Sequence, residues 1–387
     1  WEQRKLGEIS EKVTEKNKNK IYSETLTNSA EYGIINQRDF FEKDISNEKN
    51  LDGYYVVHPD DFVYNPRISN LAPVGPIKRN KLGRTGVMSP LYYVFRIDGV
   101  DKTYLEKYFS SNRWHIFMKM NGDSGARSDR FAIKDSVFRE MPIPIPSNLE
   151  QTRIGNFLKQ LDDTITLYHK KLDKLKELKR AYLYQIFEQR LRFFGFSGDW
   201  EQGKLGDLAE FSKGNGYTKS DLTEEGKPII LYGRLYTNYQ TIIDTVDTFV
   251  IEKENSVISK GNEVIVPSSG ETAEDISRAS VVSIPGVILG GDLNIVQPSD
   301  KIDPVFLALT ISNGKQQKEL SKRAQGKSIV HLHNSDLKEV NLLFPKKEEQ
   351  MRIGNFFKRF DETIALHQSK IDKLTKIKKG FLQKMFI

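Results

Sequence analysis

The sequence predicts an α+β chain built as a tandem repeat, in which two mixed α/β regions are separated by two long helices that pair with each other. Residues 146–187 and 345–386 align without a gap at an offset of 199 residues, with 20 identities in 42 positions. The same offset relates WEQRKLGEI at residues 1–9 to WEQGKLGDL at residues 200–208. Between these repeated segments lie short runs rich in Val, Ile, Tyr and Phe, separated by Gly, Pro, Asn and Asp, a pattern typical of strands and turns.

Length and composition favour a folded protein of at least two domains. The chain has 387 residues, of which 38% are hydrophobic and 11% aromatic, enough to build packed cores. It contains no cysteine, which excludes disulfides and thiolate metal sites and fits a reducing cytoplasm. The sequence shows no signal peptide and no run long enough to span a membrane. Because Trp200 follows the lead-in LRFFGFSGD at residues 191–199, we expect a similar lead-in ahead of Trp1.

The net charge of +7 suggests a nucleic-acid partner, but its distribution weakens the argument. Residues 150–190 carry nine Lys and Arg against six Asp and Glu, and residues 345–387 carry eleven against five. The two helical segments therefore hold a surplus of +9, and the rest of the chain is about −2. A DNA-binding surface must be sought in local patches.

The repeat predicts globular regions at 1–145 and 191–344 and long helices within 146–190 and 345–387. In the first region we expect strands at 54–57, 62–64 and 91–95 and a helix over 101–120. A Gly-rich turn follows at 121–127. The alternating prolines of 141–146 then impose an extended exit.

The first long helix begins with a capping box, Ser147 followed by Glu150. Apolar side chains recur at alternating spacings of four and three, the seam of a coiled coil. We expect this interface to include Ile154, Leu158, Leu161, Ile165, Leu172 and Leu175 in the first helix and Ile353, Phe357, Phe360, Ile364, Ile371 and Leu374 in the second. The 33 residues from Ile154 to Ile186 span roughly 50 Å, and the obvious partner is the other copy. The alternative, that each helix packs only on its own domain, stays open.

The second globular region keeps the skeleton of the first while most side chains differ. Asp101, Tyr104 and Leu105 correspond to Asp303, Phe306 and Leu307, and Pro66 corresponds to Pro267, at offsets between 199 and 202 residues. Similar helices with divergent domains suit a protein that reads two different targets at a fixed spacing.

These features closely resemble the specificity (S, or HsdS) subunit of bacterial type I restriction-modification systems. The resemblance rests on the repeated Glu-Gln-x-Arg-Ile-Gly-Asn-Phe at 150–157 and 349–356, the proline-rich strands before it, the Trp-Glu-Gln-x-Lys-Leu-Gly openings and the order domain–helix–domain–helix. It covers essentially the whole chain.

The resemblance implies that each globular region is a target recognition domain reading one half of an interrupted, asymmetric double-stranded DNA sequence. It implies that the helices form an antiparallel coiled coil that separates the two domains. Two methyltransferase subunits would dock on the helices, bind S-adenosylmethionine and methylate adenine at N6. Restriction subunits, with ATP and Mg, would join for cleavage. The chain itself would be a non-catalytic subunit without a metal or cofactor, in the bacterial cytoplasm.

Local patches suggest where DNA would bind. Residues 62–97 contain no acidic residue and six basic ones, and a Gly/Pro-rich loop there could follow a phosphate backbone. The two Gly-containing turns, residues 311–333 and two loops of the second region add further candidates. The candidate DNA-binding residues are Arg67, Lys78, Arg79, Asn80, Lys81, Arg84, Arg127, Arg130, Arg234, Ser269, Lys322, Arg323, Lys327 and Ser328. A merely solvated role for these loops is the alternative.

Other motifs are weaker. Gly122-Asp-Ser-Gly125 copies the surroundings of a trypsin-like nucleophile without that family's wider pattern. His331-Leu-His333 could hold a metal, but a structural or DNA-facing role is favoured. No dinucleotide fingerprint, P-loop or adenine-methyltransferase motif is present, which argues against an autonomous enzyme. A coiled-coil scaffold whose domains bind proteins is the other alternative.

Overall fold

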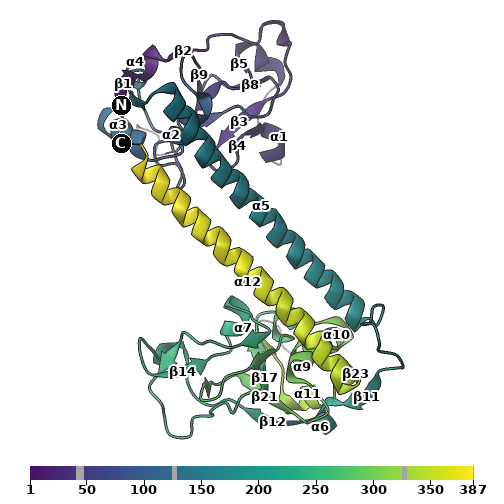
Figure 1. Cartoon of the computed structure of the whole chain (residues 1–387). Helices are drawn as coiled ribbons and strands as arrows, with labels where there is room; N and C mark the ends of the chain where they lie inside the picture. Colours follow the sequence, from purple (N-terminus) through teal and green to yellow (C-terminus); the bar gives the residue numbers. More distant parts are fainter. Residues whose placement is uncertain (41–47, 124–128, 325–328, 387) are drawn as a thin grey trace. The chain divides into compact units, whose positions relative to one another are not determined.

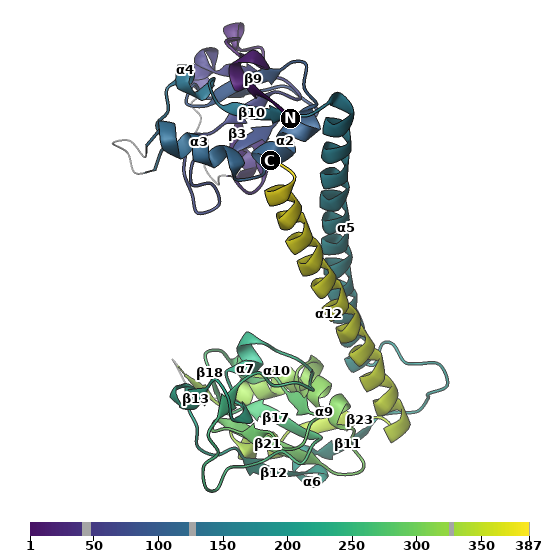
Figure 2. The same cartoon turned by 60° about the vertical axis from the view of Figure 1, so that its left-hand side comes forward.

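The computed structural model describes residues 1–40, 48–123, 129–324 and 329–386 (Figures 1 and 2). It divides into two compact units: unit 1 comprises residues 1–169 and 369–387, and unit 2 comprises residues 170–368. Both long helices pass from one unit into the other, so each unit contains one globular region and a half of each helix.

The strands of unit 1 form small antiparallel sheets. A four-stranded sheet has the order β2-β9-β6-β7, and three pairs join β1 with β10, β3 with β4 and β5 with β8. The strands are β1 Glu2–Lys5, β2 Ser10–Lys12, β3 Leu26–Ser29, β4 Gly33–Asn36, β5 Tyr55–Val57, β6 Phe62–Tyr64, β7 Ile77–Arg79, β8 Gly86–Met88, β9 Tyr93–Ile97 and β10 Pro142–Ile145. The expected strands at 54–57 and 62–64 are confirmed as β5 and β6, and the strand expected at 91–95 is β9, which begins and ends two residues later.

Unit 2 has a larger central sheet of order β12-β21-β17-β19-β15, a second sheet β13-β16-β14-β20, and the pairs β11-β23 and β18-β22. The β14–β20 and β15–β19 pairs are parallel and the other strand pairs are antiparallel. The strands are β11 Glu201–Lys204, β12 Ala209–Lys213, β13 Leu222–Thr223, β14 Lys227–Ile230, β15 Ile242–Ile243, β16 Phe249–Val250, β17 Glu263–Pro267, β18 Ser269–Gly270, β19 Ser280–Val282, β20 Ile288–Leu289, β21 Leu293–Pro298, β22 Val330–His331 and β23 Asn341–Phe344.

Short helices pack around these sheets, and two long helices follow the two globular regions. The helices are α1 Gln37–Phe40, α2 Lys102–Phe109, α3 Arg113–Asn121, α4 Asp135–Phe138, α5 Asn148–Phe187, α6 Leu205–Leu208, α7 Arg234–Thr237, α8 Ala273–Ile276, α9 Pro304–Ile311, α10 Gly314–Arg323, α11 Asn334–Lys338 and α12 Lys347–Lys384, with 3-10 turns η1 Leu6–Glu8, η2 Lys18–Lys20, η3 Glu48–Gly53 and η4 Lys219–Asp221. The single helix expected over 101–120 is instead α2 and α3. Ser110, Ser111 and Asn112 separate them, because their side chains compete for backbone hydrogen bonds; the Ser110 hydroxyl donates to the Glu106 carbonyl at 2.8 Å.

The opening strand of each repeat pairs with the strand that leads into the long helix. Glu2 lies opposite Ile145 in unit 1, and Glu201 lies opposite Phe344 in unit 2, so both pairs keep the same register at the 199-residue offset. The proline-rich exit at 141–146 is therefore a paired strand, β10, and not a free linker.

The repeated Glu-Gln-x-Arg-Ile-Gly motif joins the start of each long helix to its own domain. In unit 1 the Gln151 side chain accepts from the Asp101 backbone N–H at 2.9 Å and donates to the Pro146 carbonyl at 2.8 Å. Gln350 makes the same bonds to Asp303 and Pro345, each at 2.8 Å. Both glutamines are fully buried, which explains why the repeat keeps this residue.

The two long helices pair antiparallel within each unit. In unit 1 Asp162 bonds Lys378 at 2.5 Å, and Phe157 meets Phe381 with ring centroids 4.9 Å apart. As the number rises along α5 it falls along α12, which defines the direction. In unit 2 the equivalent residues at the 199-residue offset make the equivalent contacts: Asp361 bonds Lys179 at 2.5 Å, and the Phe356 and Tyr182 ring centroids are 5.4 Å apart. The pairing is therefore pseudo-symmetric.

The predicted seam needs one correction. Ile154 and Leu158 belong to the hydrophobic core of unit 1, and Ile353 and Phe357 belong to the core of unit 2. The second and third turns of each helix thus pack into a domain core, as the alternative interpretation held. Further along, Leu172 and Ile371 are buried, and Leu161, Ile165, Leu175, Phe360, Ile364 and Leu374 are half-buried. Leu161 packs against the unit 1 core, and Phe360 meets Tyr182 of α5 with ring centroids 5.9 Å apart. The place of the other positions in the helix interface stays a prediction.

Each helix ends in a domain core. Phe386, past the end of α12, packs on Tyr104 of α2 with ring centroids 5.5 Å apart, and Phe187 of α5 packs on Phe306 of α9 at 5.8 Å. Figures 1 and 2 show both chain termini beside α2 and α3 of unit 1.

Candidate nucleic-acid interface

Two arginines that are far apart in the sequence lie opposite each other in unit 1. Arg67 and Arg130 form an isolated antiparallel bridge. Its register is fixed by backbone hydrogen bonds from Phe131 to the Pro66 carbonyl at 2.8 Å and from Ile68 to the Asp129 carbonyl at 3.0 Å. The fold thus brings together two of the candidate DNA-binding residues.

The charges of this arginine pair are poorly compensated by the protein. Arg67 is exposed and makes no ion pair with the described residues, and the nearest carboxylate oxygen of Asp129 lies 4.0 Å from Arg130 Nε. Like charges placed directly opposite on neighbouring strands are unfavourable. An anion, or the acceptor-rich edge of a base, would relieve this repulsion.

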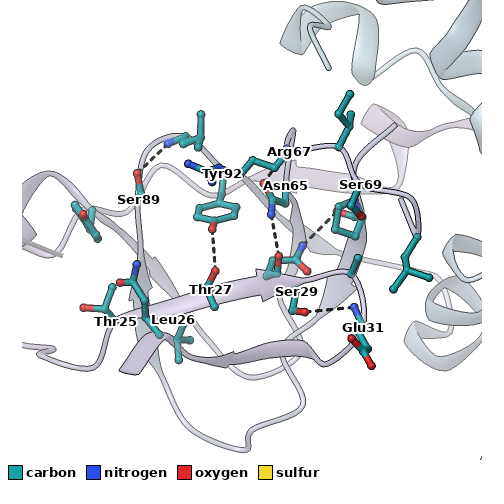
Figure 3. Close-up of a pocket in the computed structure, with 18 residues that line it drawn as sticks. Thr25, Leu26, Thr27, Ser29, Glu31, Asn65, Arg67, Ser69, Ser89 and Tyr92 are labelled. Carbon is teal, nitrogen blue, oxygen red and sulfur yellow. Dashed lines mark hydrogen bonds between the residues drawn. The ribbon is translucent and has the colours of Figure 1, made fainter. Parts of the chain in front are cut away.

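Arg67 also lines a pocket of about 510 Å³. Figure 3 shows Tyr92, Arg67, Asn65 and Ser69 along one side and Thr25, Thr27 and Ser29 along the other. Ten of the eighteen lining residues carry a hydroxyl or an amide, Glu31 adds a carboxylate, and apolar side chains such as Leu26 and Leu71 complete the lining. The Thr27 and Tyr92 hydroxyls bond at 3.0 Å. The pocket therefore combines hydroxyl and amide groups with one carboxylate and the Arg67 side chain.

Unit 2 contains the same structural position with different side chains. Ser269 of β18 lies opposite His331 of β22, and the Leu332 N–H bonds the Ser268 carbonyl at 3.0 Å. Ser269 lies 202 residues after Arg67, and His331 lies 201 residues after Arg130. The matching backbone bonds, Phe131 to Pro66 and Leu332 to Ser268, make Ser268 the counterpart of Pro66, so the expected correspondence of Pro66 with Pro267 is wrong at this position. The two bridges share a backbone pattern, with Arg67 and Arg130 in one and Ser269 and His331 in the other.

The helix before this position carries further cations in unit 2. Lys315, Lys318 and Lys322 are exposed on α10 at spacings of three and four, so they share one helix face. They form no ion pair with any described residue. Arg323 faces elsewhere, since it bonds Glu319 at 3.0 Å and the Glu339 carbonyl at 3.4 Å.

The basic stretch at 62–97 is less available than its sequence suggests, because acidic residues from other segments reach it. Arg79 and Lys81 both pair with Glu106, at 2.7 and 3.0 Å. Arg84 bonds Glu24 through two nitrogens, at 2.8 and 2.7 Å, and this bond lowers the pKa of the Glu24 carboxyl. These three cations are largely neutralised in place.

Other candidates in this stretch have structural roles. Asn80 is 1% exposed, and its amide donates to the His58 and Arg84 carbonyls, each at 3.1 Å. The expectation that Asn80 reads a base edge is therefore wrong for this conformation. Lys78 is half-buried on β7, where burial lowers the pKa of its ammonium group.

In unit 2, Arg234 braces a loop rather than facing open solvent. Its guanidinium bonds Asp247 and Gln240, each at 2.9 Å, and the Thr245 carbonyl at 3.0 Å. Arg127, Lys327 and Ser328 lie outside the described residues.

His331 was not among the candidate DNA-binding residues, although a structural or DNA-facing role was favoured for His331-Leu-His333. Its pairing with Ser269 could not be predicted, because the sequence does not show which segments pair. Over the described part of the chain, no group of three or more His, Cys, Asp or Glu side chains is placed to hold a metal ion. No helix among the described residues combines the length and apolar character needed to cross a membrane.

A family model, described as the type I restriction modification DNA specificity domain, matches residues 1–177 and again residues 197–376. The type I restriction enzyme MjaVIII specificity subunit of Methanocaldococcus jannaschii is 20% identical over 266 residues. That match covers 65% of this chain but only 62% of the relative, less than two thirds of its length. A putative type I restriction enzyme MjaX specificity subunit of the same organism is 28% identical over 198 residues, covering 49% of this chain and 45% of that protein.

Solved structures share the fold. The type I restriction-modification S subunit from M. genitalium superposes with a TM-score of 0.62 at 15% identity, covering 100% of this chain and 96% of that one. A chain from a study of complex assembly and conformational transition of the type I R-M system gives 0.56 at 14% identity, covering 100% and 97%.

Proposed function

This chain belongs to the type I restriction-modification DNA specificity family, and we propose that it reads a two-part, asymmetric DNA sequence for a methyltransferase complex. Residues 1–145 and 191–344 are the target recognition domains in this proposal. Residues 146–190 and 345–387 are the helices that separate them and carry partner subunits. The chain itself performs no chemistry.

The observation that carries the proposal is the repeated strand bridge with unlike side chains. Both units hold two backbone segments in the same register, with Arg67 and Arg130 in one and Ser269 and His331 in the other. Two arginines suit phosphates or guanine, whose major-groove edge offers two acceptors. Serine and histidine suit other hydrogen-bonding patterns. Because the backbone pattern is alike in the two domains and the side chains on it differ, we expect the two domains to read different half-sites.

The surface of the helices supports a partner present in two copies. Arg153 and Asn156 of α5 are exposed, and their counterparts Arg352 and Asn355 of α12 are exposed as well. The residue types are the same in both copies, and because none of the four residues is buried, packing does not explain this identity. Such pairs fit two identical subunits that each meet one copy of the repeat. We identify these as methyltransferase subunits, which would supply S-adenosylmethionine; restriction subunits, with ATP and Mg, would join them for cleavage.

The test is sequence-selective binding by the chain together with its methyltransferase partner. Mapping N6-methyladenine in the source genome identifies the duplex to use. Binding measured by fluorescence anisotropy across a salt series should weaken steeply as salt rises. Arg67→Gln should weaken binding more than Arg84→Gln, because Glu24 already neutralises Arg84. If no sequence-selective binding is seen at any salt concentration, the proposal is rejected. The alternative, a coiled-coil scaffold whose domains bind proteins, would then remain.

A further inference from the structure

In unit 1 a single carboxylate joins both long helices to the globular domain. One oxygen of Asp162 on α5 bonds Lys378 of α12 at 2.5 Å, and the other oxygen bonds Lys107 of α2 at 2.6 Å. Lys107 is 4% exposed, and its other carboxylate neighbour, Glu106, lies further away at 3.6 Å. Because a buried ammonium group is costly without a close carboxylate, this contact keeps α2 in place against the helix pair.

Unit 2 makes the same connection with different chemistry. One oxygen of Asp361 on α12 bonds Lys179 of α5 at 2.5 Å, and the other oxygen accepts a hydrogen bond from the Thr241 hydroxyl at 3.2 Å. Thr241 directly precedes β15, and its carbonyl accepts from the Val281 N–H of β19 at 2.9 Å. Asp361 is thereby joined to the edge of the central sheet.

The two domains use different segments to reach this carboxylate. Helices α2 and α9 are equivalent, because Asp101 and Asp303 cap them through the same hydrogen bond at an offset of 202 residues. The counterpart of Lys107 is therefore Leu309, which is buried in the core of unit 2 and has no group that could bond a carboxylate. Thr241, from another part of the domain, supplies the bond instead. The connection is thus present in both units, although its chemistry differs.

A second attachment lies near the start of each long helix. The Gln151 side chain bonds the Asp101 backbone at 2.9 Å, and the Gln350 side chain bonds the Asp303 backbone at 2.8 Å. In both helices the aspartate of the ion pair follows this glutamine by 11 residues, roughly 16 Å along the helix axis. Two attachments separated by this distance prevent the domain from turning about either one.

We propose that Asp162 and Asp361 are positioning residues that fix the orientation of each target recognition domain on its helices, and so restrict the spacing between half-sites that the chain accepts. The inference rests on the proposed function, since it concerns how two half-sites are read together. Without the bond at the aspartate, each domain stays attached through its glutamine and can turn about that point. It then meets half-sites at more than one spacing.

Selectivity for the spacer between the half-sites tests the proposal. The full chain, assembled with its methyltransferase partner, is given its target duplex and duplexes whose spacer is one base pair longer or shorter, and the dissociation constants are compared. Thr241→Val keeps the side-chain shape and removes the hydroxyl that bonds Asp361, and Lys107→Met removes the ammonium group that bonds Asp162. Each should reduce the preference for the original spacer by about three- to ten-fold, the scale of one hydrogen bond.

Two control variants separate positioning from stability. Thr241→Ser keeps the hydroxyl and should keep the preference for the original spacer. Thr363→Val makes the same exchange on α12, where the described hydroxyl contact is a bond to the Arg359 carbonyl of the same helix at 2.7 Å, and it should change nothing. A variant that is only destabilised would bind all three duplexes less well and leave their ratio unchanged.

An unchanged ratio in both the Thr241→Val and the Lys107→Met proteins, with the original duplex still bound selectively, would overturn this proposal and leave the proposed function standing. An unaltered chain that binds all three duplexes equally would overturn it as well. Absence of any sequence-selective binding by the unaltered chain would overturn the proposed function and this inference together.

Discussion

Gly155 shows why single residues of the repeated motif are fixed by the fold. A Cβ at this position would lie 2.9 Å from the backbone nitrogen of Tyr104, so glycine lets α5 and α2 approach closely. Gly380 lies within α12, where an added Cβ would meet no described atom within 4 Å. Two glycines in similar helical settings therefore have opposite requirements.

Gly155→Ala should destabilise the protein by about 1–3 kcal/mol, because the backbone of α2 must move. Gly380→Ala should stabilise it by about 0.5–1 kcal/mol, the usual gain of alanine over glycine in a helix. Thermal unfolding of both variants checks the pair. A stabilising Gly155→Ala would show that the close approach of the helices is wrong.

Asp162 gives unit 1 a pH-dependent contribution to stability. Burial raises the pKa of this carboxyl, but hydrogen bonds from Lys107 at 2.6 Å and Lys378 at 2.5 Å outweigh burial and lower it overall. A lowered folded-state pKa stabilises the fold above the ordinary aspartate pKa of about 3.9, and that stabilisation is lost as the pH falls through the folded-state value.

Asp162→Asn should therefore cost about 1–3 kcal/mol at pH 7, because it removes the nearer carboxylate of buried Lys107 and leaves only that of Glu106, at 3.6 Å. The difference from the unaltered protein should shrink below about pH 4. Urea unfolding at both pH values measures it. Asp163→Asn is the matched control: among the described residues Asp163 pairs with Lys159 alone, at the surface, and its loss should cost less than about 0.5 kcal/mol at either pH. An equal effect of both substitutions would argue against the Asp162 network.

The candidate site illustrates what residue patterns can and cannot predict. The stretch 62–97 has no acidic residue, yet Glu24 and Glu106 neutralise three of its cations from outside it. Such partners lie 25 to 60 residues away in the chain, a distance at which no periodicity reports contact. Arg67 and Arg130 are separate candidates in the sequence, and their pairing depends on a strand bridge that only the fold supplies.

At the scale of elements, the long helices were predictable because their apolar spacing and their repetition reinforce each other. The packing of the helix starts into the domain cores was not predictable, because an apolar residue buried between two helices and one buried in a domain core look alike in sequence. The ion pairs between the helices are the more specific marker of their pairing, since Asp162 and Lys378 reappear as Asp361 and Lys179.

Replacing Lys179 and Asp361 with alanine, singly and together, should give a coupling energy of about 0.5–1 kcal/mol. The same cycle at Lys378 and Asp162 should give a larger value, because that pair is less exposed on the aspartate side and shares Lys107. Chemical denaturation of the six variants measures both couplings. Purely additive effects at both sites would mean that the antiparallel register is wrong.

At the scale of the molecule, the two copies of the repeat share the contacts that join each domain to its long helix and differ in the side chains of the strand bridge. The β1–β10 and β11–β23 registers, the buried glutamines and the helix ion pairs are the same in both copies. A similar antiparallel bridge pairs Arg67 with Arg130 in one copy and Ser269 with His331 in the other. An overall repeat is visible in sequence, whereas this local substitution appears only when the two folds are compared.

Exchanging residues 200–344 for the corresponding region of another family member tests this separation. The exchanged segment contains both strands of the β11–β23 pair, so this pair is exchanged as a whole. The bridge between Ser269 and His331 is replaced with it. The hybrid, assembled with its methyltransferase partner, should methylate a sequence altered in one half only, because unit 1 retains its own arginines. Sequencing of methylated adenines in cells that express the hybrid reads both halves at once. A change in both halves would show that the two domains do not read DNA independently.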